Sequence, residues 1–349
     1  MKHFYFFLLF ITSFCFSQQA YYNGIDFNQT GLDLKDDLAA LIISTHTNTL
    51  SYGWDATQAT DVNPSNSSNV LLVYGWENGS DGDCTNDLER DINSNGGSNC
   101  DYNREHIYAK SLATPPMDDS GPGADGHHIR ASDVQRNGLR ASLLFADGSG
   151  NSGKVNGNQY WYPGDEWKGD VARIIMYMYL RYGSQCLPSN VGIGSSAGTP
   201  DDMIDLFLEW NAEDQVSDYE IQRNTYHENT SNTFAQGNRN PFIDNPALAT
   251  AIWGGPEAED TWGIILGTDD FKDHNSISMF PNPVKNNFVY FSTTQNINVI
   301  IYDILGKEVK VENINPNRDF VDVSTLHKGI YLVRLISEDG QVTKKLIKQ

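Results

Sequence analysis

The sequence predicts an α+β main domain followed by a small all-β sandwich. Two patterns favour this division: long helical segments among short strands as far as Trp253, and evenly spaced short β segments from Ile277 onward. Between them, residues 254–275 are acidic, contain glycine and show no clear period, which is typical of a linker. A chain of 349 residues is long enough for two or three domains.

Residues 1–17 have the order of a secretory signal peptide. Lys2 and His3 precede an apolar run that ends at Phe14, and Ser17 precedes the cleavage site that we expect before Gln18. A membrane anchor is the alternative, but the run is shorter than the roughly 20 apolar residues that a spanning helix needs. No later segment is apolar enough, so we expect no transmembrane segment after cleavage. The expected domains are residues 1–17 (signal peptide), 18–255 (main domain), 256–275 (linker) and 276–349 (sandwich).

In the main domain, helical periodicity is clearest over residues 169–182, and it recurs at residues 201–210 and 217–226. Residues 21–49 have apolar side chains near helical spacing, and residues 70–76 predict a buried strand. The strands expected in the sandwich are residues 287–292, 297–303, 318–323, 329–336 and 341–347.

Three cysteines remain once Cys15 has left with the signal peptide. In an exported protein, Cys84 and Cys100 form the natural disulfide, because they lie close together in a loop rich in Gly, Asn and Asp. Cys186 is then an unpaired, buried thiol. A metal site built from the three is the less favoured alternative, since no CxxC spacing occurs.

The charge distribution argues against a broad nucleic-acid-binding surface. The net charge is −21, and residues 3–270 hold 13 basic against 37 acidic side chains. Nucleic-acid binders usually have a basic footprint. Arginines nevertheless gather at positions 104, 130, 136 and 140, and a divalent cation there would add positive charge where a phosphate binds. We therefore expect weak, salt-sensitive binding of nucleic acid.

Residues 100–140 hold the side chains that phosphodiester hydrolysis needs. That reaction requires a base that activates water, a cation that neutralises charge on the phosphate, and stabilisation of the leaving oxygen. Neighbouring strand residues face opposite ways, so one side chain on the metal and the next on the water is the economical interpretation. A Glu-His or His-His dipeptide alone is weak, and the pattern is not HExxH, which removes support for a zinc protease. The candidate residues are, in order, Glu105, His106, Asp125, His127, His128 and Asn137.

These segments, in this order, resemble the bacterial endonuclease I family over about residues 21–253. The resemblance implies a ββα-metal (His-Me finger) nuclease domain that binds one divalent ion, usually Mg²⁺, with Mn²⁺ or Ca²⁺ as alternatives. It matches His106 to the general base and Glu105 and Asn137 to the metal ligands. Gly126 stands where an apolar residue is common, and His128 stands where some members have Asn, so neither is assigned chemistry. The matching blocks are Asn103 to His106, Asp125 to Asp133, Arg136 to Gly138, Gly169 to Arg173 and Gln236 to Asp244.

Other polar residues of these blocks have more than one interpretation. Arg140, placed with the catalytic residues, and Arg130 would bind the scissile phosphate bidentately, and Arg104 is a further candidate for substrate binding. Asn238 and Arg239 would order the wall of the site or contact phosphate. Two further groups favour structural roles: Asp170 with Arg173, one helical turn apart, and the core candidates Trp161, Trp167 and Trp210.

The C-terminal sandwich resembles the sorting domain of the type IX secretion system. The alternative is a carbohydrate-binding or adhesive sandwich. The resemblance implies export through the periplasm of a gram-negative bacterium to the outer cell surface or the medium, with the secretion machinery as a partner. The matching blocks are Phe280 to Val284, Tyr302 to Val309, Leu326 to Val333 and Thr343 to Ile347.

Together these features predict a secreted, monomeric endonuclease that acts on DNA, with RNA as a second candidate substrate, and leaves 5′-phosphate products. The sequence offers no base-reading helix, so contacts to the backbone and nonspecific cleavage are expected. With an ordinary pKa for His106, activity should rise through about pH 6 to 7. Another metal-dependent phosphoesterase, or a surface adhesin, remains an alternative.

Overall fold

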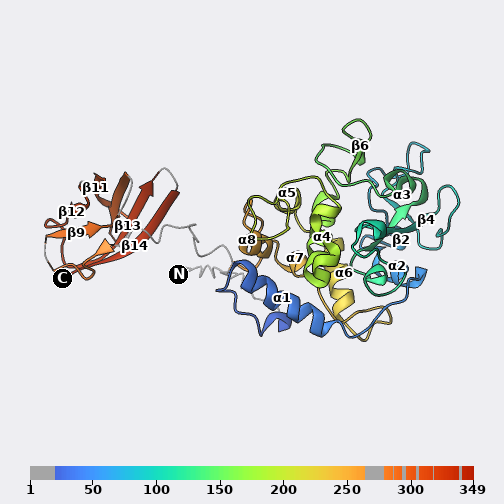
Figure 1. Cartoon of the computed structure of the whole chain (residues 1–349), viewed down its shortest axis with the longest axis horizontal. Helices are drawn as coiled ribbons and strands as arrows, with labels where there is room; N and C mark the ends of the chain where they lie inside the picture. Colours follow the sequence, from blue (N-terminus) through green and yellow to red (C-terminus); the bar gives the residue numbers. More distant parts are fainter. Residues whose placement is uncertain are drawn as a thin grey trace, which may run out of the picture. The chain divides into compact units, whose positions relative to one another are not determined.

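The computed structural model in Figure 1 describes residues 20–263, 279–285, 287–292, 296–303, 306–316, 318–337 and 340–349. The expected signal peptide and residues 264–275 of the expected linker lie outside the described residues. The chain divides into two compact units, Met1–Leu266 and Gly267–Gln349. In the parts of the chain that the structure describes, no helix is long and apolar enough to cross a membrane.

The first unit mixes helices with short strands, which confirms the predicted α+β class. Its α-helices are α1 (Gly31–Thr45), α2 (Trp54–Thr60), α3 (Val134–Arg140), α4 (Lys168–Tyr182), α5 (Asp205–Glu213), α6 (Asp218–Glu228), α7 (Pro241–Asp244) and α8 (Ala247–Trp253). Its strands are β1 (Val62–Asn63), β2 (Asn66–Leu71), β3 (Glu89–Asp91), β4 (Tyr102–His106), β5 (Ile129–Asp133), β6 (Gly153–Val155) and β7 (Tyr160–Tyr162). They form the antiparallel sheets β1-β2-β3, β4-β5 and β6-β7.

Two predicted elements differ from those observed. The helix expected from residue 201 begins at Asp205, because the Asp201 carboxylate accepts the backbone N–H of Met203 and forms a turn. The buried strand expected over residues 70–76 ends at Leu71. The next residues are buried but leave the sheet, and the backbone N–H of Val73 donates to Ala131 of β5 instead.

Helix α4 runs through the core of the first unit. Twelve of its 15 residues are buried, and it packs against α1, α5 and α7. Trp161, Trp167 and Trp210 are buried in the same core, which confirms the prediction that they are structural. Ser217 and Glu220 form a capping box that starts α6.

The expected linker begins later than residue 256. Trp262 is 5% exposed, and its ring centroid lies 5.1 Å from that of Tyr22 and 5.2 Å from that of Phe27. Thr261 Oγ1 donates to the carbonyl oxygen of Asp244 at 2.6 Å. Residues 256–263 therefore pack on the first unit. Their acidic, glycine-containing composition gave no sign of this packing, which depends on the buried Trp262.

The burial of Trp262 predicts that two truncated chains differ in stability. A chain of residues 18–255 lacks the buried Trp262 side chain, whereas a chain of residues 18–263 keeps it. The shorter chain should lose about 3–5 kcal/mol of unfolding free energy, the usual cost of deleting a buried Trp side chain. Urea unfolding of both chains measures the difference. Equal midpoints and slopes would show that residues 256–263 contribute nothing to the fold.

The second unit is a two-sheet sandwich, as the sequence predicts. One sheet has the order β11-β10-β13-β14 and the other β12-β9-β8. Its core takes buried residues from both sheets, including Val289 and Phe291 from one and Val299 and Val333 from the other. The strands are β8 (Met279–Phe280), β9 (Phe288–Phe291), β10 (Ile297–Tyr302), β11 (Glu308–Ile314), β12 (Phe320–Asp322), β13 (Gly329–Ser337) and β14 (Gly340–Lys348).

The cysteines behave as predicted. Cys84 and Cys100 form a disulfide, and Cys186 is a buried free thiol. The disulfide closes a loop that contains β3 and ends just before β4.

Several histidines are buried in the first unit. His128 and His227 are fully buried, and neither ring nitrogen of either residue has a hydrogen-bond partner among the described residues. His127 is 4% exposed and its ring centroid lies 4.5 Å from that of His227. Burial lowers the pKa of all three, to about 3 for His128.

These lowered pKa values predict that acid destabilises the first unit. The unfolded chain takes up protons on these histidines below about pH 6.5, whereas the folded chain does not until a lower pH. Between about pH 6 and 4.5, His128, with a folded pKa of about 3, should reduce the unfolding free energy by roughly 1.4 kcal/mol per pH unit, and the lowered pKa values of His127 and His227 add to this slope in the same direction. Urea unfolding across this range checks the slope, and a His128→Gln variant should show a slope that is smaller by about one proton. A stability that does not change with pH would contradict the buried, neutral state.

Candidate active site

Two antiparallel strands and the helix that follows them bring the predicted catalytic segment together. Strand β4 pairs with β5 so that Glu105 lies opposite Arg130. Helix α3 begins directly after β5, because the Asp133 carboxylate accepts the backbone N–H groups of Gln135 and Arg136. Arg90 Nη1 donates to the other oxygen of Asp133 at 2.7 Å, so the cap itself is held in place. Figure 1 shows β4 and α3 on the same side of the first unit.

His106 is held as a neutral imidazole. Its Nε2 lies 2.9 Å from the carbonyl oxygen of Gly123. A carbonyl oxygen can only accept a hydrogen bond, so Nε2 carries the hydrogen and donates it, and the neutral ring presents its lone pair at Nδ1. The side chain is 9% exposed, and burial lowers the pKa of His106 to about 4. The imidazole is therefore unprotonated at neutral pH.

Glu105 is buried among groups that fix its carboxylate. Tyr74 donates its hydroxyl to Glu105 Oε1 at 2.9 Å, and Arg140 Nη1 lies 3.2 Å from the same oxygen. Burial raises the pKa of Glu105, and Arg140 and Tyr74 oppose that shift. Arg140 also donates to the carbonyl oxygens of His106 and Ile107. With only 1% of its side chain exposed, Arg140 positions Glu105 and β4 in this structure.

Asn137 lies on the same helix–strand interface as Glu105. Its Nδ2 donates to Asn103 Oδ1 at 2.7 Å, which leaves Asn137 Oδ1 as the atom that would bind a cation. Asn103 and Glu105 alternate on one face of β4, and Arg140 lies one helical turn beyond Asn137. The contacts Asn103–Asn137 and Glu105–Arg140 therefore run side by side across this interface.

The donor set fits a hard divalent cation. One carboxylate and one amide oxygen suit Mg²⁺, which usually keeps several waters and takes few protein ligands. Among the described residues, no group of three or more His, Cys, Asp or Glu side chains is arranged to hold a metal ion. A site of one carboxylate and one amide oxygen would not count among such groups.

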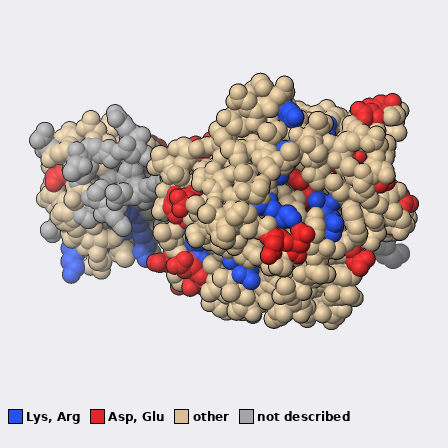
Figure 2. All heavy atoms as spheres, turned by 45° about the vertical axis from the view of Figure 1, so that its right-hand side comes forward, with Lys and Arg blue, Asp and Glu red and all other residues tan. Residues whose placement is uncertain are grey.

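Arg104, the arginine of β4, is partly buried. Its guanidinium carbon lies 3.8 Å from the ring centroid of Tyr52 and 4.2 Å from that of Trp54. The Tyr52 ring also lies 4.9 Å from the His106 ring, so this stack continues to the base. In the view of Figure 2, basic and acidic side chains lie next to one another on the first unit without a broad basic face.

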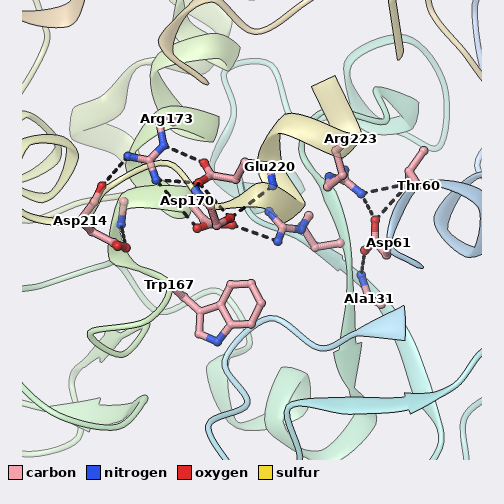
Figure 3. A network of polar contacts seen from close by, with 12 residues as sticks. Thr60, Asp61, Ala131, Trp167, Asp170, Arg173, Asp214, Glu220 and Arg223 are labelled. Carbon is pink, nitrogen blue, oxygen red and sulfur yellow. Dashed lines mark hydrogen bonds and ion pairs between the residues drawn. The ribbon is translucent and has the colours of Figure 1, made fainter. Parts of the chain in front are cut away.

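Three other predicted substrate-binding residues are engaged inside the protein. Arg130 is 2% exposed and pairs with Asp170 of α4, a residue labelled in Figure 3. Arg239 pairs with Asp244 and Glu228. Asn238 is fully buried and donates to the Tyr177 hydroxyl at 2.8 Å. This burial favours structural roles for Arg130, Arg239 and Asn238 over contact with phosphate.

Gly126 has a local explanation. A Cβ atom at this position would lie 2.5 Å from Cε1 of His227, which is too close for any larger residue. The glycine therefore makes room for the buried His227 ring.

The sequence does not indicate that Tyr52, Tyr74 and Arg90 contact the site. Each contacts the site from a segment remote from the motif, and an aromatic or basic residue in a loop gives no separate signal. The Cys84–Cys100 bridge was the one hint that β3 lies close to the site, because it brings that loop next to β4.

Strands β4 and β5 and helix α3 thus carry a neutral imidazole, a buried carboxylate and an amide, which are the kinds of group that metal-assisted hydrolysis of phosphodiesters requires. Residues 30–247 match the Endonuclease I family. The chain belongs to this family, and it is a secreted nuclease, a hydrolase that acts on phosphodiester bonds.

Two relatives agree with this assignment. The chain is 41% identical to an extracellular ribonuclease of Bacillus subtilis (strain 168) over 245 residues, which cover 67% of this chain and 78% of the relative. It is 39% identical to an extracellular ribonuclease of Bacillus amyloliquefaciens over 237 residues, which cover 64% of this chain and 75% of that relative.

The second unit has a separate match. Residues 278–349 match the secretion system C-terminal sorting domain. The protein is therefore secreted or displayed at the cell surface, with the type IX machinery as its export partner. A solved structure, dimeric latent PorU from Porphyromonas gingivalis, is 25% identical over 21% of this chain and 9% of its own, with a TM-score of 0.16, too low to bear on the fold.

The lowered pKa of His106 changes the expected pH dependence of activity. The base must be neutral, so with a pKa of about 4 the rate should rise through about pH 4 and be flat from pH 6 to 8, instead of rising through pH 6 to 7. Initial cleavage rates at saturating metal, with circular dichroism at each pH to confirm folding, measure this profile. His106→Ala should lower the rate by about 10²- to 10⁴-fold across it. A rising limb centred near pH 6.5 would show that His106 keeps an ordinary pKa.

Proposed function

We propose that the first unit is a sequence-nonspecific endonuclease that hydrolyses DNA and RNA and leaves 5′-phosphate products. The observation that carries this proposal is the hydrogen bond from His106 Nε2 to the carbonyl oxygen of Gly123, which leaves Nδ1 ready to accept a proton on the strand that also carries Glu105. The extracellular ribonucleases among its relatives support RNA as a substrate.

In the proposed reaction, His106 Nδ1 takes the proton of a water that attacks the scissile phosphate. Glu105 and Asn137 would hold Mg²⁺, which when bound neutralises charge on the phosphate and stabilises the leaving 3′ oxygen. Tyr74 and Arg140 keep the Glu105 carboxylate in place. Arg104 is the arginine of β4 that is open enough to contact the phosphate backbone.

Nonspecific cleavage follows from what the site presents. The cationic and amide groups described above suit phosphate and sugar, which carry no sequence information. Helix α3 packs Arg136 and Arg140 against β7 and β4, and its exposed positions Gly138 and Leu139 carry no hydrogen-bonding side chain that would read a base edge. Action as a monomer stays part of this proposal.

The metal requirement tests the assignment of roles. EDTA should stop cleavage of plasmid DNA and of RNA, and Mg²⁺ or Mn²⁺ should restore it. Glu105→Gln removes the only ligand charge, so at low metal concentration it should be more impaired than Asn137→Ala, and excess Mg²⁺ should partly rescue both. Titration of activity with Mg²⁺ for each variant gives these comparisons.

His106→Ala is the control, because it leaves both ligands in place and added Mg²⁺ should not rescue it. If Mg²⁺ rescued His106→Ala and neither ligand variant, base and ligand would have to be exchanged. Cleavage that persists in EDTA would remove the metal from the mechanism. Cleavage of DNA alone, or of RNA alone, would narrow the proposed substrate range.

A further inference from the structure

Most arginines of the acidic first unit have a carboxylate partner. Six form ion pairs within the described residues: Arg90, Arg130, Arg140, Arg173, Arg223 and Arg239. Among the described arginines without an ion pair, Arg104 donates to the carbonyl oxygen of Tyr52 and Arg181 to Nδ1 of His46. The guanidinium of Arg136 in α3 forms neither an ion pair nor a hydrogen bond in the part of the chain that the structure describes. Its Nε is a buried donor without a partner.

Arg136 is nevertheless well ordered by packing. The side chain is 9% exposed, and its guanidinium carbon lies 4.2 Å from the ring centroid of Trp76 and 5.9 Å from that of Trp161. Asp133 and Asp83 are the acidic groups that face it across a distance. Asp133 is already occupied by Arg90 and by the cap of α3, and Asp83 is exposed and accepts from Thr85.

A guanidinium held this way has lost water without gaining an anion. Burying a charge costs free energy unless it is paired and hydrogen-bonded. In a unit with so many carboxylates, an arginine left unpaired suggests that its partner is an anion from outside the chain.

The position of Arg136 identifies that anion. Arg136 precedes the proposed metal ligand Asn137 and lies one helical turn from Arg140, which contacts Glu105. Cβ atoms at this spacing are about 5–6 Å apart. A polyanion with its scissile phosphate at Glu105 and Asn137 would therefore bring a neighbouring phosphate to Arg136.

A nearby cavity can be excluded as the phosphate site. It has a volume of about 290 Å³, and Trp76 forms part of its wall. Asp165 and Glu166 also line it, and their carboxylates would repel a phosphate. The group that would bind the phosphate is therefore the guanidinium of Arg136, and not this cavity.

We propose that Arg136 binds a backbone phosphate next to the scissile one, and that Trp76 holds its guanidinium in place by cation–π contact. This inference rests on the proposed function and adds a substrate-binding residue to the same site. It also offers an acidic protein a cationic contact for nucleic acid, because Arg104 and Arg136, two described cations without an ion pair, both lie on the ββα unit.

Salt dependence of binding tests the proposal. The probe is a fluorescent single-stranded oligonucleotide of mixed sequence, and the protein is the mature full-length chain with His106→Ala, measured by anisotropy in EDTA. Adding Arg136→Met, which keeps an apolar stem against Trp76, should weaken binding roughly tenfold. The slope of log affinity against log salt should fall by about 0.7, the contribution of one phosphate contact on a single strand.

Two further variants separate charge from packing. Arg136→Lys keeps the charge, so it should keep the salt slope while losing part of the affinity. Arg318→Ala removes an exposed arginine of the second unit and should change neither quantity.

A folded Arg136→Met protein with unchanged affinity and slope would overturn the proposal. Weaker binding with an unchanged slope would do so as well, because it indicates a structural role. Should Arg136→Met fail to fold, a smaller slope for Arg136→Lys would overturn the proposal, and the wild-type slope with weaker binding would support it.

The same protein also distinguishes failure of the proposed function from failure of the proposal for Arg136. If the His106→Ala protein still shortened the oligonucleotide in the presence of Mg²⁺, the assignment of the base would be wrong, whatever the salt slopes show for Arg136.

Discussion

Buried ion pairs that link β5, helices α4 and α6 and the end of α2 are the interactions on which the first unit depends. Helices α4 and α6 supply most of the charges, and Figure 3 shows Arg173 with Glu220 and Arg223 with Asp61. Asp61 also accepts the backbone N–H of Ala131 in β5 at 2.5 Å, so the network holds the backbone of the site directly. Burial and the nearby Glu220 raise the pKa of Asp170 well above its usual range, against the effect of Arg130 and Arg173. Removing one partner of such a pair typically costs about 3–5 kcal/mol, so these charges restrict the site to one arrangement. The pairs are Arg130–Asp170, Arg173–Glu220 and Arg223–Asp61.

Periodicity predicted the elements whose burial is set by their own residues. Helix α4 has apolar residues all around it, and strand β10 alternates buried and less buried positions, so both were found from the sequence. Strand β11 was missed, because its apolar residues Val309 and Val311 are exposed and alternate with charged ones. The packing of residues 256–263 was missed for a related reason, since a single tryptophan in an acidic segment has no period.

In the candidate site, the sequence proposes which residues take part but does not reveal their environments. The order of motifs grouped Glu105, His106 and Asn137 into one candidate site before the fold was known. It could not reveal that Arg130 is enclosed by α4 and α6, because that enclosure arises from segments far away in the chain. The pKa of His106 is a property of the same kind, since it depends on how much protein covers the ring.

The bridge between Cys84 and Cys100 links the geometry of the site to the compartment in which the protein folds. Arg90 lies within the bridged loop, donates to the carbonyl oxygen of Cys84 and holds the Asp133 cap of α3. Disulfides form in oxidising surroundings outside the cytoplasm and are rare inside it. Before export, the chain therefore lacks a covalent restraint on the loop that orients its catalytic helix. An enzyme able to degrade the nucleic acids of the cell that makes it is thus fully assembled only after leaving that cell's cytoplasm.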